Sequence, residues 1–109
     1  MSAHDAVDAL RDLGLSNYEA RVFVALHRLG DGTAQDVAEV ADVPRSQVYG
    51  AADGLAARGL LEVVESSPKT YRPVSLERAR AQLRERIDRQ QARAFDNLEA
   101  VAGDHGDRT

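Results

Sequence analysis

The side chains best suited to bind a ligand gather in one short stretch, Pro-Arg-Ser-Gln-Val-Tyr-Gly at residues 44–50. An arginine can fork onto guanine or phosphate, a glutamine can pair bidentately with adenine, and hydroxyl groups can donate to phosphate oxygens. A glycine among them would keep a helix thin enough for close approach to a duplex. We therefore take as candidate DNA-binding residues Arg45, Ser46, Gln47, Tyr49 and Gly50.

Other kinds of site chemistry find little support in the sequence. There is no cysteine, which excludes thiolate chemistry and cysteine-based zinc sites. The histidines, His4, His27 and His105, are too far apart to form a metal-ligand motif. Paired catalytic carboxylates, a glycine-rich phosphate loop and a nucleophile with its base are all missing. We predict no enzymatic activity, no cofactor and no metal.

Helical signals surround the candidate stretch on both sides. Residues 3–14 carry apolar side chains at helical spacing, and Ser16 with Glu19 forms a capping box that opens a helix ending near Gly30. Thr33 with Asp36 is a second, weaker box, opening a short helix up to Ala41. Pro44 suits the first position of a further helix over 44–58, and Gly59 suits its end. Two helices joined by a short turn are predicted here.

After Gly59 the apolar period changes from 3.6 to 2, which predicts a hairpin over 62–74 with a turn at Ser66-Ser67-Pro68-Lys69. Pro73 places the second strand at an edge or near its end. Basic and hydroxyl side chains near this tip suit contact with phosphate or the minor groove. To the candidate DNA-binding residues we therefore add Lys69, Thr70 and Arg72 from the hairpin, and Thr33 before the short helix.

The order of elements predicts a mainly α fold with a small β-hairpin, a winged helix-turn-helix over 1–75. A charged helix over 76–103 follows, and we expect a disordered tail over 104–109. A narrow apolar stripe on that helix suits a two-helix dimer seam, parallel or antiparallel. The seam residues are Leu76, Leu83, Ile87, Ala94, Leu98 and Val101.

Net charge argues against a generic nucleic-acid binder, because the chain carries −4. Its bias is nevertheless unusual, since 13 of the 14 basic residues are Arg and Asp outnumbers Glu by 11 to 7. This composition is typical of a GC-rich, salt-adapted proteome such as that of a haloarchaeon, where acidity is a background feature. No apolar run or signal sequence is evident, so we expect a cytoplasmic protein.

Over 13–79 the sequence resembles the DNA-binding domain of the TrmB family of archaeal transcriptional regulators. The motifs that carry the resemblance are LGLSNYEARVF, ADVPRSQVY, LAARGLLE and PKTYRPVSLERA. The resemblance implies promoter binding as a homodimer, with the helix opened by Pro44, Arg45 and Ser46 in the groove and the Lys69 hairpin as wing. Sensors of the family characteristically carry a large C-terminal sugar-binding domain. Sugar sensing is therefore not carried over, and no small-molecule effector is evident.

Three interpretations follow. The first is a dimeric, sequence-specific regulator of a pseudo-palindromic promoter site. The second is a winged-helix adaptor that binds protein and does not recognise DNA sequence. A nonspecific DNA coat is the weakest, because it depends on phosphate contacts and this chain has little positive charge. The sequence leaves open which promoter is bound, whether the outcome is repression or activation, and which signal acts on the protein. It also leaves open whether the chain stands alone or is the first part of a longer regulator. The Gly-Asp-His-Gly-Asp-Arg-Thr ending favours a stand-alone chain.

Overall fold

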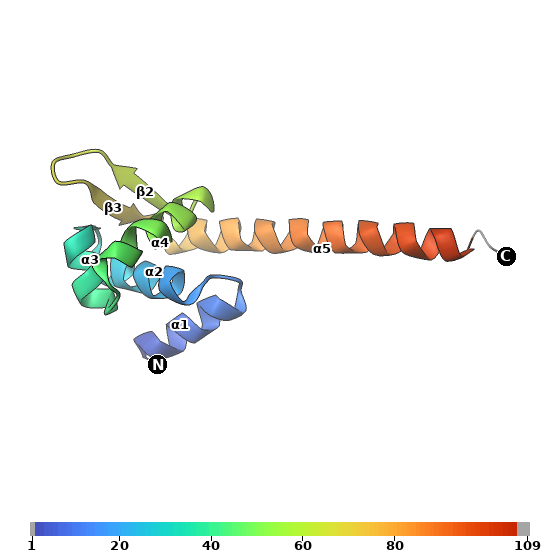
Figure 1. Ribbon diagram of the computed structural model, residues 1–109, viewed down its shortest axis with the longest axis horizontal. Helices are drawn as coiled ribbons and strands as arrows, with labels where there is room; N and C mark the ends of the chain where they lie inside the picture. Colours follow the sequence, from blue (N-terminus) through green and yellow to red (C-terminus); the bar gives the residue numbers. More distant parts are fainter. Residues whose placement is uncertain (1, 107–109) are drawn as a thin grey trace.

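The protein consists of a winged-helix unit and one long helix that leaves it (Figure 1). The structure is a computed structural model that describes residues 2–106, with side chains described as far as residue 103. The elements in order are α1 (Ala3–Asp12), α2 (Asn17–Leu29), β1 (Gly32–Thr33), α3 (Ala34–Ala41), α4 (Arg45–Ala57), β2 (Leu61–Val64), β3 (Thr70–Pro73) and α5 (Leu76–Gly106). The predicted fold class is confirmed, with one strand more than the predicted hairpin.

Local capping sets where the first three helices begin. The hydroxyls of Ser2, Ser16 and Thr33 each accept a bond from the amide three residues on, and the acidic residue there returns one. Both capping boxes predicted from sequence are therefore confirmed. Because each box satisfies amides that have no partner within the helix, it stabilises a helix start by about 1 kcal/mol.

Helix α4 begins at Arg45, one residue later than predicted. Pro44 has φ −55° and ψ 136°, an extended conformation, so it precedes the helix and is not its first residue. It still fixes the backbone entering α4, since its ring limits φ. At the other end Gly59 adopts φ +75°, the left-handed conformation that ends the helix as predicted.

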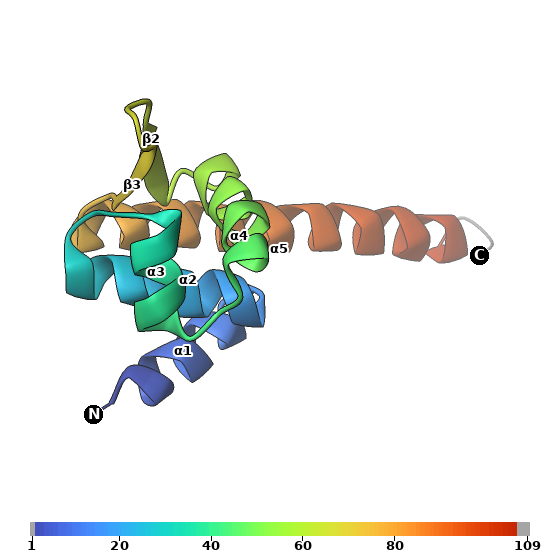
Figure 2. The same cartoon turned by 60° about the vertical axis from the view of Figure 1, so that its left-hand side comes forward.

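A third strand, β1, was not predicted. The sheet has the order β1-β3-β2 with both pairings antiparallel, and Thr33 faces Thr70 across β1 and β3. β3 is therefore the central strand. Pro73 is its last residue and lies opposite Leu61, so the prediction that this proline lies near the end of its strand is correct. The sheet therefore ties the start of α3 to the hairpin, which stands out from the helices (Figure 2).

One apolar core holds α2, α3, α4 and the sheet together. Its largest fully buried side chains are Val22, Leu26, Val37, Val48, Leu55 and Leu60. Ala79 and Leu83, from the first turns of α5, belong to the same core, with Leu83 only 7% exposed. Most of the side chain of Leu83, one of the predicted seam residues, is therefore covered within its own chain.

Beyond these anchors α5 runs on alone (Figure 1), and its 31 residues correspond to about 46 Å. The sequence predicted a helix over 76–103 and a tail over 104–109. Residues 104–106 are instead helical, because the interior Gly103 weakens a helix by only about 1 kcal/mol without ending it. Residues 107–109 lie outside the described part of the chain.

An ion pair joins α2 to the end of α4. Oε1 of Glu19 accepts a bond of 2.8 Å from the Ser16 amide and lies 3.4 Å from Nη2 of Arg58. Both side chains are largely buried, and a Cβ on Gly54 would collide with the Glu19 carboxylate. The glycine therefore lets α4 cross α2 closely enough for this ion pair.

We predict that Glu19→Ala lowers the free energy of unfolding by about 2 to 3 kcal/mol, because it removes a cap and leaves Arg58 largely buried without its partner. Urea unfolding measures the change. Asp36→Ala is the matched control, since it breaks a capping box with no arginine attached and should cost only about 1 kcal/mol. Equal losses in the two variants would show that the ion pair is unimportant.

Candidate nucleic-acid interface

The candidate recognition residues lie on the exposed face of α4. Pro44 ends the turn from α3, and Val48 anchors the helix in the core. This leaves the candidate residues Arg45, Ser46, Gln47, Tyr49 and Gly50 all exposed. A helix anchored on one face presents its other face rigidly, as an element entering a DNA groove must.

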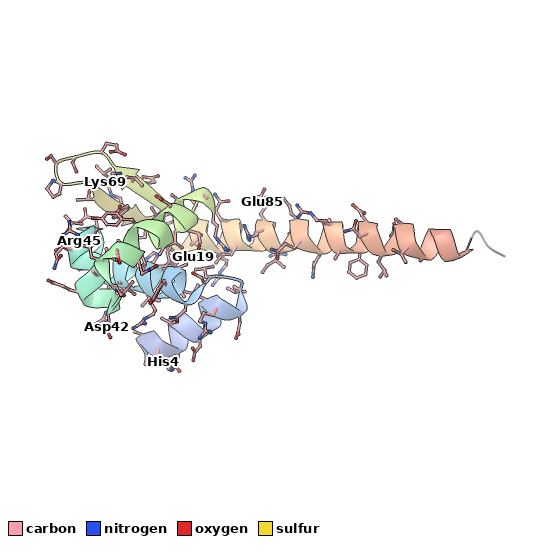
Figure 3. All side chains as sticks on the ribbon, viewed as in Figure 1. His4, Glu19, Asp42, Arg45, Lys69 and Glu85 are labelled. Carbon is pink, nitrogen blue, oxygen red and sulfur yellow. The ribbon has the colours of Figure 1, made fainter. Side chains whose placement is uncertain are left out.

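Arg45 and Tyr49 are linked one turn apart. Nε of Arg45 donates a hydrogen bond of 3.2 Å to the Tyr49 hydroxyl. The bond uses one of the five guanidinium N–H groups, so the fork can still contact a carboxylate or phosphate oxygen. Figure 3 shows Arg45 and Lys69 at the end of the molecule opposite the far end of α5.

A cavity of about 400 Å³ opens between the starts of α3 and α4 and the hairpin tip. Four of the residues predicted from sequence line it together, Thr33, Arg45, Tyr49 and Lys69. The other lining residues, which the sequence analysis missed, are Ala34, Gln35, Pro68 and Tyr71. Three separate elements thus direct polar groups toward one concave surface, which is the shape that a DNA backbone or groove edge requires.

Several predicted residues do not line this cavity. Ser46, Gln47 and Gly50 lie elsewhere on the exposed surface of α4, where the structure gives them no side-chain partner. Arg72 is exposed on β3 opposite Glu62, and Thr70 pairs with Thr33 in the sheet.

Gln35 is the missed residue with the clearest signal in the sequence. It follows the Thr33 cap by two residues, so it lies in the exposed first turn of α3, and its amide donates 2.9 Å to Glu39. The start of a helix carries free amides and a partial positive charge. A polar side chain at this position could have been included on that ground alone.

Lys69 has a weak partner. Its Nζ lies 3.9 Å from Oε1 of Glu65, and both side chains are well exposed. Exposed pairs of this kind contribute about 0 to 1 kcal/mol, so the ammonium is free to exchange Glu65 for another anion. The hairpin tip can therefore contact a phosphate at little cost.

Tyr71 forms the buried side of the cavity. Its side chain is 3% exposed, and burial raises the pKa of its phenol, with Tyr49, Asp53 and Glu65 adding to the shift. Burial disfavours the phenolate because it withholds solvent, and the nearby groups disfavour it because they add negative potential. The hydroxyl therefore stays protonated as a hydrogen-bond donor at neutral pH.

Two further kinds of feature would be visible in the described residues, a metal cluster and a membrane span. Within residues 2–103, no three side chains of His, Cys, Asp or Glu come together as metal ligands. None of the helices over residues 2–106 combines the length and apolarity needed to cross a membrane.

The combination of a helix-turn-helix, a packed α5 root and a β2–β3 wing defines a winged-helix protein. Residues 10–77 match the model of the family described as "Sugar-specific transcriptional regulator TrmB". The chain therefore belongs to the TrmB family, as the sequence resemblance predicted.

Two curated relatives are similar over most of this chain. The HTH-type sugar sensing transcriptional regulator TrmBL1 of Pyrococcus furiosus is 30% identical over 102 residues, which is 90% of this chain and 30% of TrmBL1. YrhO of Bacillus subtilis is 29% identical, over 90% of this chain and 37% of YrhO. The chain thus spans about a third of the length of these relatives.

Solved structures agree on the fold. TrmBL2, described as an archaeal chromatin protein with a novel mode of DNA binding, has a TM-score of 0.78 at 30% identity, over 91% of this chain and 38% of TrmBL2. A MarR family transcriptional regulator from Silicibacter pomeroyi has a TM-score of 0.56 at 24% identity, over 87% of this chain and 68% of its own. The second likeness shows the fold alone.

We predict that one of the three tyrosines ionises late in a titration followed by ultraviolet absorbance, and that Tyr71→Phe removes this late phase. Since the raised pKa means that the unfolded chain ionises first, the folded protein should lose stability as pH rises above 10.0, the ordinary tyrosine value. Tyr18→Phe serves as the control and should keep the late phase. A late phase that survives in Tyr71→Phe would contradict this assignment.

Proposed function

We propose that the protein is a DNA-binding transcriptional regulator in which α4 enters the major groove and the β2–β3 hairpin acts as the wing. The observation that carries this proposal is the cavity where Thr33, Arg45, Tyr49 and Lys69 converge from three elements. Arg45 and Lys69 are the two cationic side chains lining it. Two cationic side chains on one concave surface are suited to receive phosphate there.

Sequence recognition falls to side chains outside the cavity. Ser46 and Gln47 are exposed in the first turn of α4, from which side chains of a recognition helix contact base edges. With a net charge of −4, the chain gains little from long-range attraction to DNA. Direct base contacts therefore carry a larger share of the affinity, more so in a salt-rich cytoplasm where charges are screened within about 3 Å.

Gly50 supports the same function by the absence of a side chain. A Cβ at this position would meet no atom within 4 Å beyond its chain neighbours and the backbone of its own helix, whereas at Gly54 it would collide with Glu19. Packing within the chain thus accounts for Gly54 and not for Gly50. Since glycine weakens a helix by about 1 kcal/mol, close approach of α4 to DNA is a sufficient reason for Gly50.

The proposed regulator acts as a homodimer that pairs through α5. Ile87 is half-buried, and Leu76, Ala94, Leu98 and Val101 are exposed on the long helix, which gives a second copy an apolar stripe to bind. A twofold dimer presents two recognition helices, which predicts a pseudo-palindromic operator with half-sites about 34 to 36 Å apart or a multiple of this.

A second function is favoured by the likeness to TrmBL2, the archaeal chromatin protein. In that case the chain would coat DNA with little sequence preference. A specific regulator should prefer one promoter fragment over bulk competitor DNA at equal salt, whereas a coating protein should not. A winged-helix adaptor for proteins would bind neither the promoter fragment nor the competitor DNA, and it should still bind its protein partner when Arg45 is replaced.

We predict that Arg45→Ala weakens binding to the cognate promoter by about 1 to 3 kcal/mol, roughly 5- to 150-fold, because it removes a phosphate or guanine contact. Fluorescence anisotropy at fixed salt measures the loss, and unfolding checks that the fold is intact. Arg93→Ala, which removes an equal charge from the far part of α5, should leave the affinity unchanged. Equal affinities for wild type and Arg45→Ala would refute the proposed interface.

We also predict that Gly50→Ala stabilises the fold by about 0.5 to 1 kcal/mol yet weakens DNA binding several-fold, because the new methyl group lies on the groove-facing surface. Gly54→Ala is the comparison variant, and it should lose stability through its collision with Glu19. Urea unfolding and anisotropy together separate the two effects. A Gly50→Ala protein that binds DNA as well as wild type would remove close approach as the reason for this glycine.

A further inference from the structure

A groove of about 450 Å³ lies on the flank of the molecule between α1, α2 and the root of α5. It is lined mainly by apolar side chains, and no residue of it lines the cavity near Arg45. Its lining residues include Leu10, Leu13, Phe23, Leu76, Ala79 and Leu83. Leu13 is 41% and Leu76 is 70% exposed, so the walls of the groove are open to solvent.

The far half of α5 carries a second set of uncovered apolar side chains. Phe95, Leu98 and Val101 are 60%, 58% and 67% exposed, and no other element of the described chain packs against them. Phe95 lies next to the predicted seam and was not counted in it. Large side chains exposed in this way mark a surface that binds another protein.

We propose that the groove of one copy receives Phe95, Leu98 and Val101 from the α5 of a second copy, so that the two long helices pair antiparallel. This inference rests on the proposed pairing through α5 and adds its direction and its contacts. One twofold interface then covers both unpartnered surfaces of each copy, because the groove of each receives the far helix of the other.

Side-chain size along α5 fits this direction. The apolar positions 76, 83, 87, 94, 98 and 101 advance by an average of about 3.6 residues per turn when the Gln90 layer is included, so they form one stripe along the helix. An antiparallel register that sets Leu76 against Val101 of the second copy also sets the small Ala79 against its Leu98. The large side chain then enters the space that the small one leaves.

Charge complementarity selects this direction over the parallel one. Residues 76–89 carry five arginines against three carboxylates, whereas residues 90–103 carry one arginine against two carboxylates. Arg80 and Arg84 line the groove, and Asp96 and Glu99 flank the apolar side chains that would enter it. In the antiparallel register Arg80 lies within about one helical turn of Asp96 and Glu99 of the second copy, and only Arg84 faces an arginine, Arg93. A parallel pair would instead face both Arg80 and Arg84 with their own copies.

In this arrangement the two winged-helix units lie at opposite ends of the helix pair. Leu76 in one copy is separated from Leu76 in the other by the length of residues 76–101, about 38 Å along the axis. The dyad falls between Asp88 and Arg89, so Gln90 and Gln91 lie within one helical turn of the centre of the pair. The spacing between the two units is then fixed by the length of α5.

Cysteine cross-linking tests the direction without reference to DNA, because the chain has no cysteine of its own. We expect Val101→Cys alone to form no disulfide dimer under a glutathione redox buffer, since the two sites are far apart. A mixture of Leu76→Cys and Val101→Cys chains, refolded together, should give a disulfide heterodimer as its main product. Non-reducing electrophoresis and mass spectrometry of the linked peptides measure both.

Sedimentation of the reduced variants at micromolar concentration is done alongside. A dimer in which Val101→Cys cross-links to itself would overturn the antiparallel direction while leaving the proposed homodimer intact. A monomer would overturn both.

As a charge control, Arg80→Glu should raise the dimer dissociation constant about twofold to fivefold per pair, and Glu99→Arg in the same chain should restore it. Absence of restoration would overturn the proposed charge pairing.

Discussion

The close crossing of α2 and α4 is the contact on which the rest of the molecule depends. It is set at one end by the Glu19–Arg58 ion pair over Gly54, and along its length by fully buried side chains such as Val22 and Leu55. A buried ion pair adds little net stability over an apolar pair, but its geometry is directional. What it supplies here is the angle at which α4 leaves the core, and hence the direction in which Arg45 and Tyr49 face.

The sheet passes that orientation on to the wing. β3 is the central strand, so it is bonded on one side to β1, which leads directly into α3, and on the other to β2, which follows α4. The Thr33–Thr70 pairing therefore holds the first turn of α3 at a fixed position relative to the hairpin. The start of α3 and the hairpin, far apart in sequence, lie side by side because a single strand connects them.

How much of this the sequence could predict depends on the range of the interaction. The capping boxes at Ser16 and Thr33 and the α4 face that begins at Arg45 depend on residues within a few positions, and the sequence predicted them. β1 has only two residues and owes its existence to a partner strand far along the chain, so no alternation could reveal it. The Glu19–Arg58 pair escaped prediction for the same reason.

Leu83 and Phe95 show the same limit on α5. Both lie on a helix whose apolar pattern is continuous, yet Leu83 is only 7% exposed whereas Phe95 is 60% exposed. The periodicity of a sequence shows which side of a helix is apolar, but it does not show whether that side packs against its own chain or against another molecule. The resemblance to the TrmB family indicated what the winged helix does. Only the structure showed that the first turns of α5 are anchored in the core while the rest of the helix extends away from it.

That division has a consequence for how such a protein can change over evolutionary time. Because Ala79 and Leu83 are fixed in the core and the helix continues unbroken to Gly106, any residue inserted between root and far end rotates everything beyond it by about 100°. Insertions of seven residues return the apolar stripe to within about 20° of the same face, while one or two residues turn it by about 100° to 200°. Related chains with this architecture should therefore differ in the length of this helix by heptads.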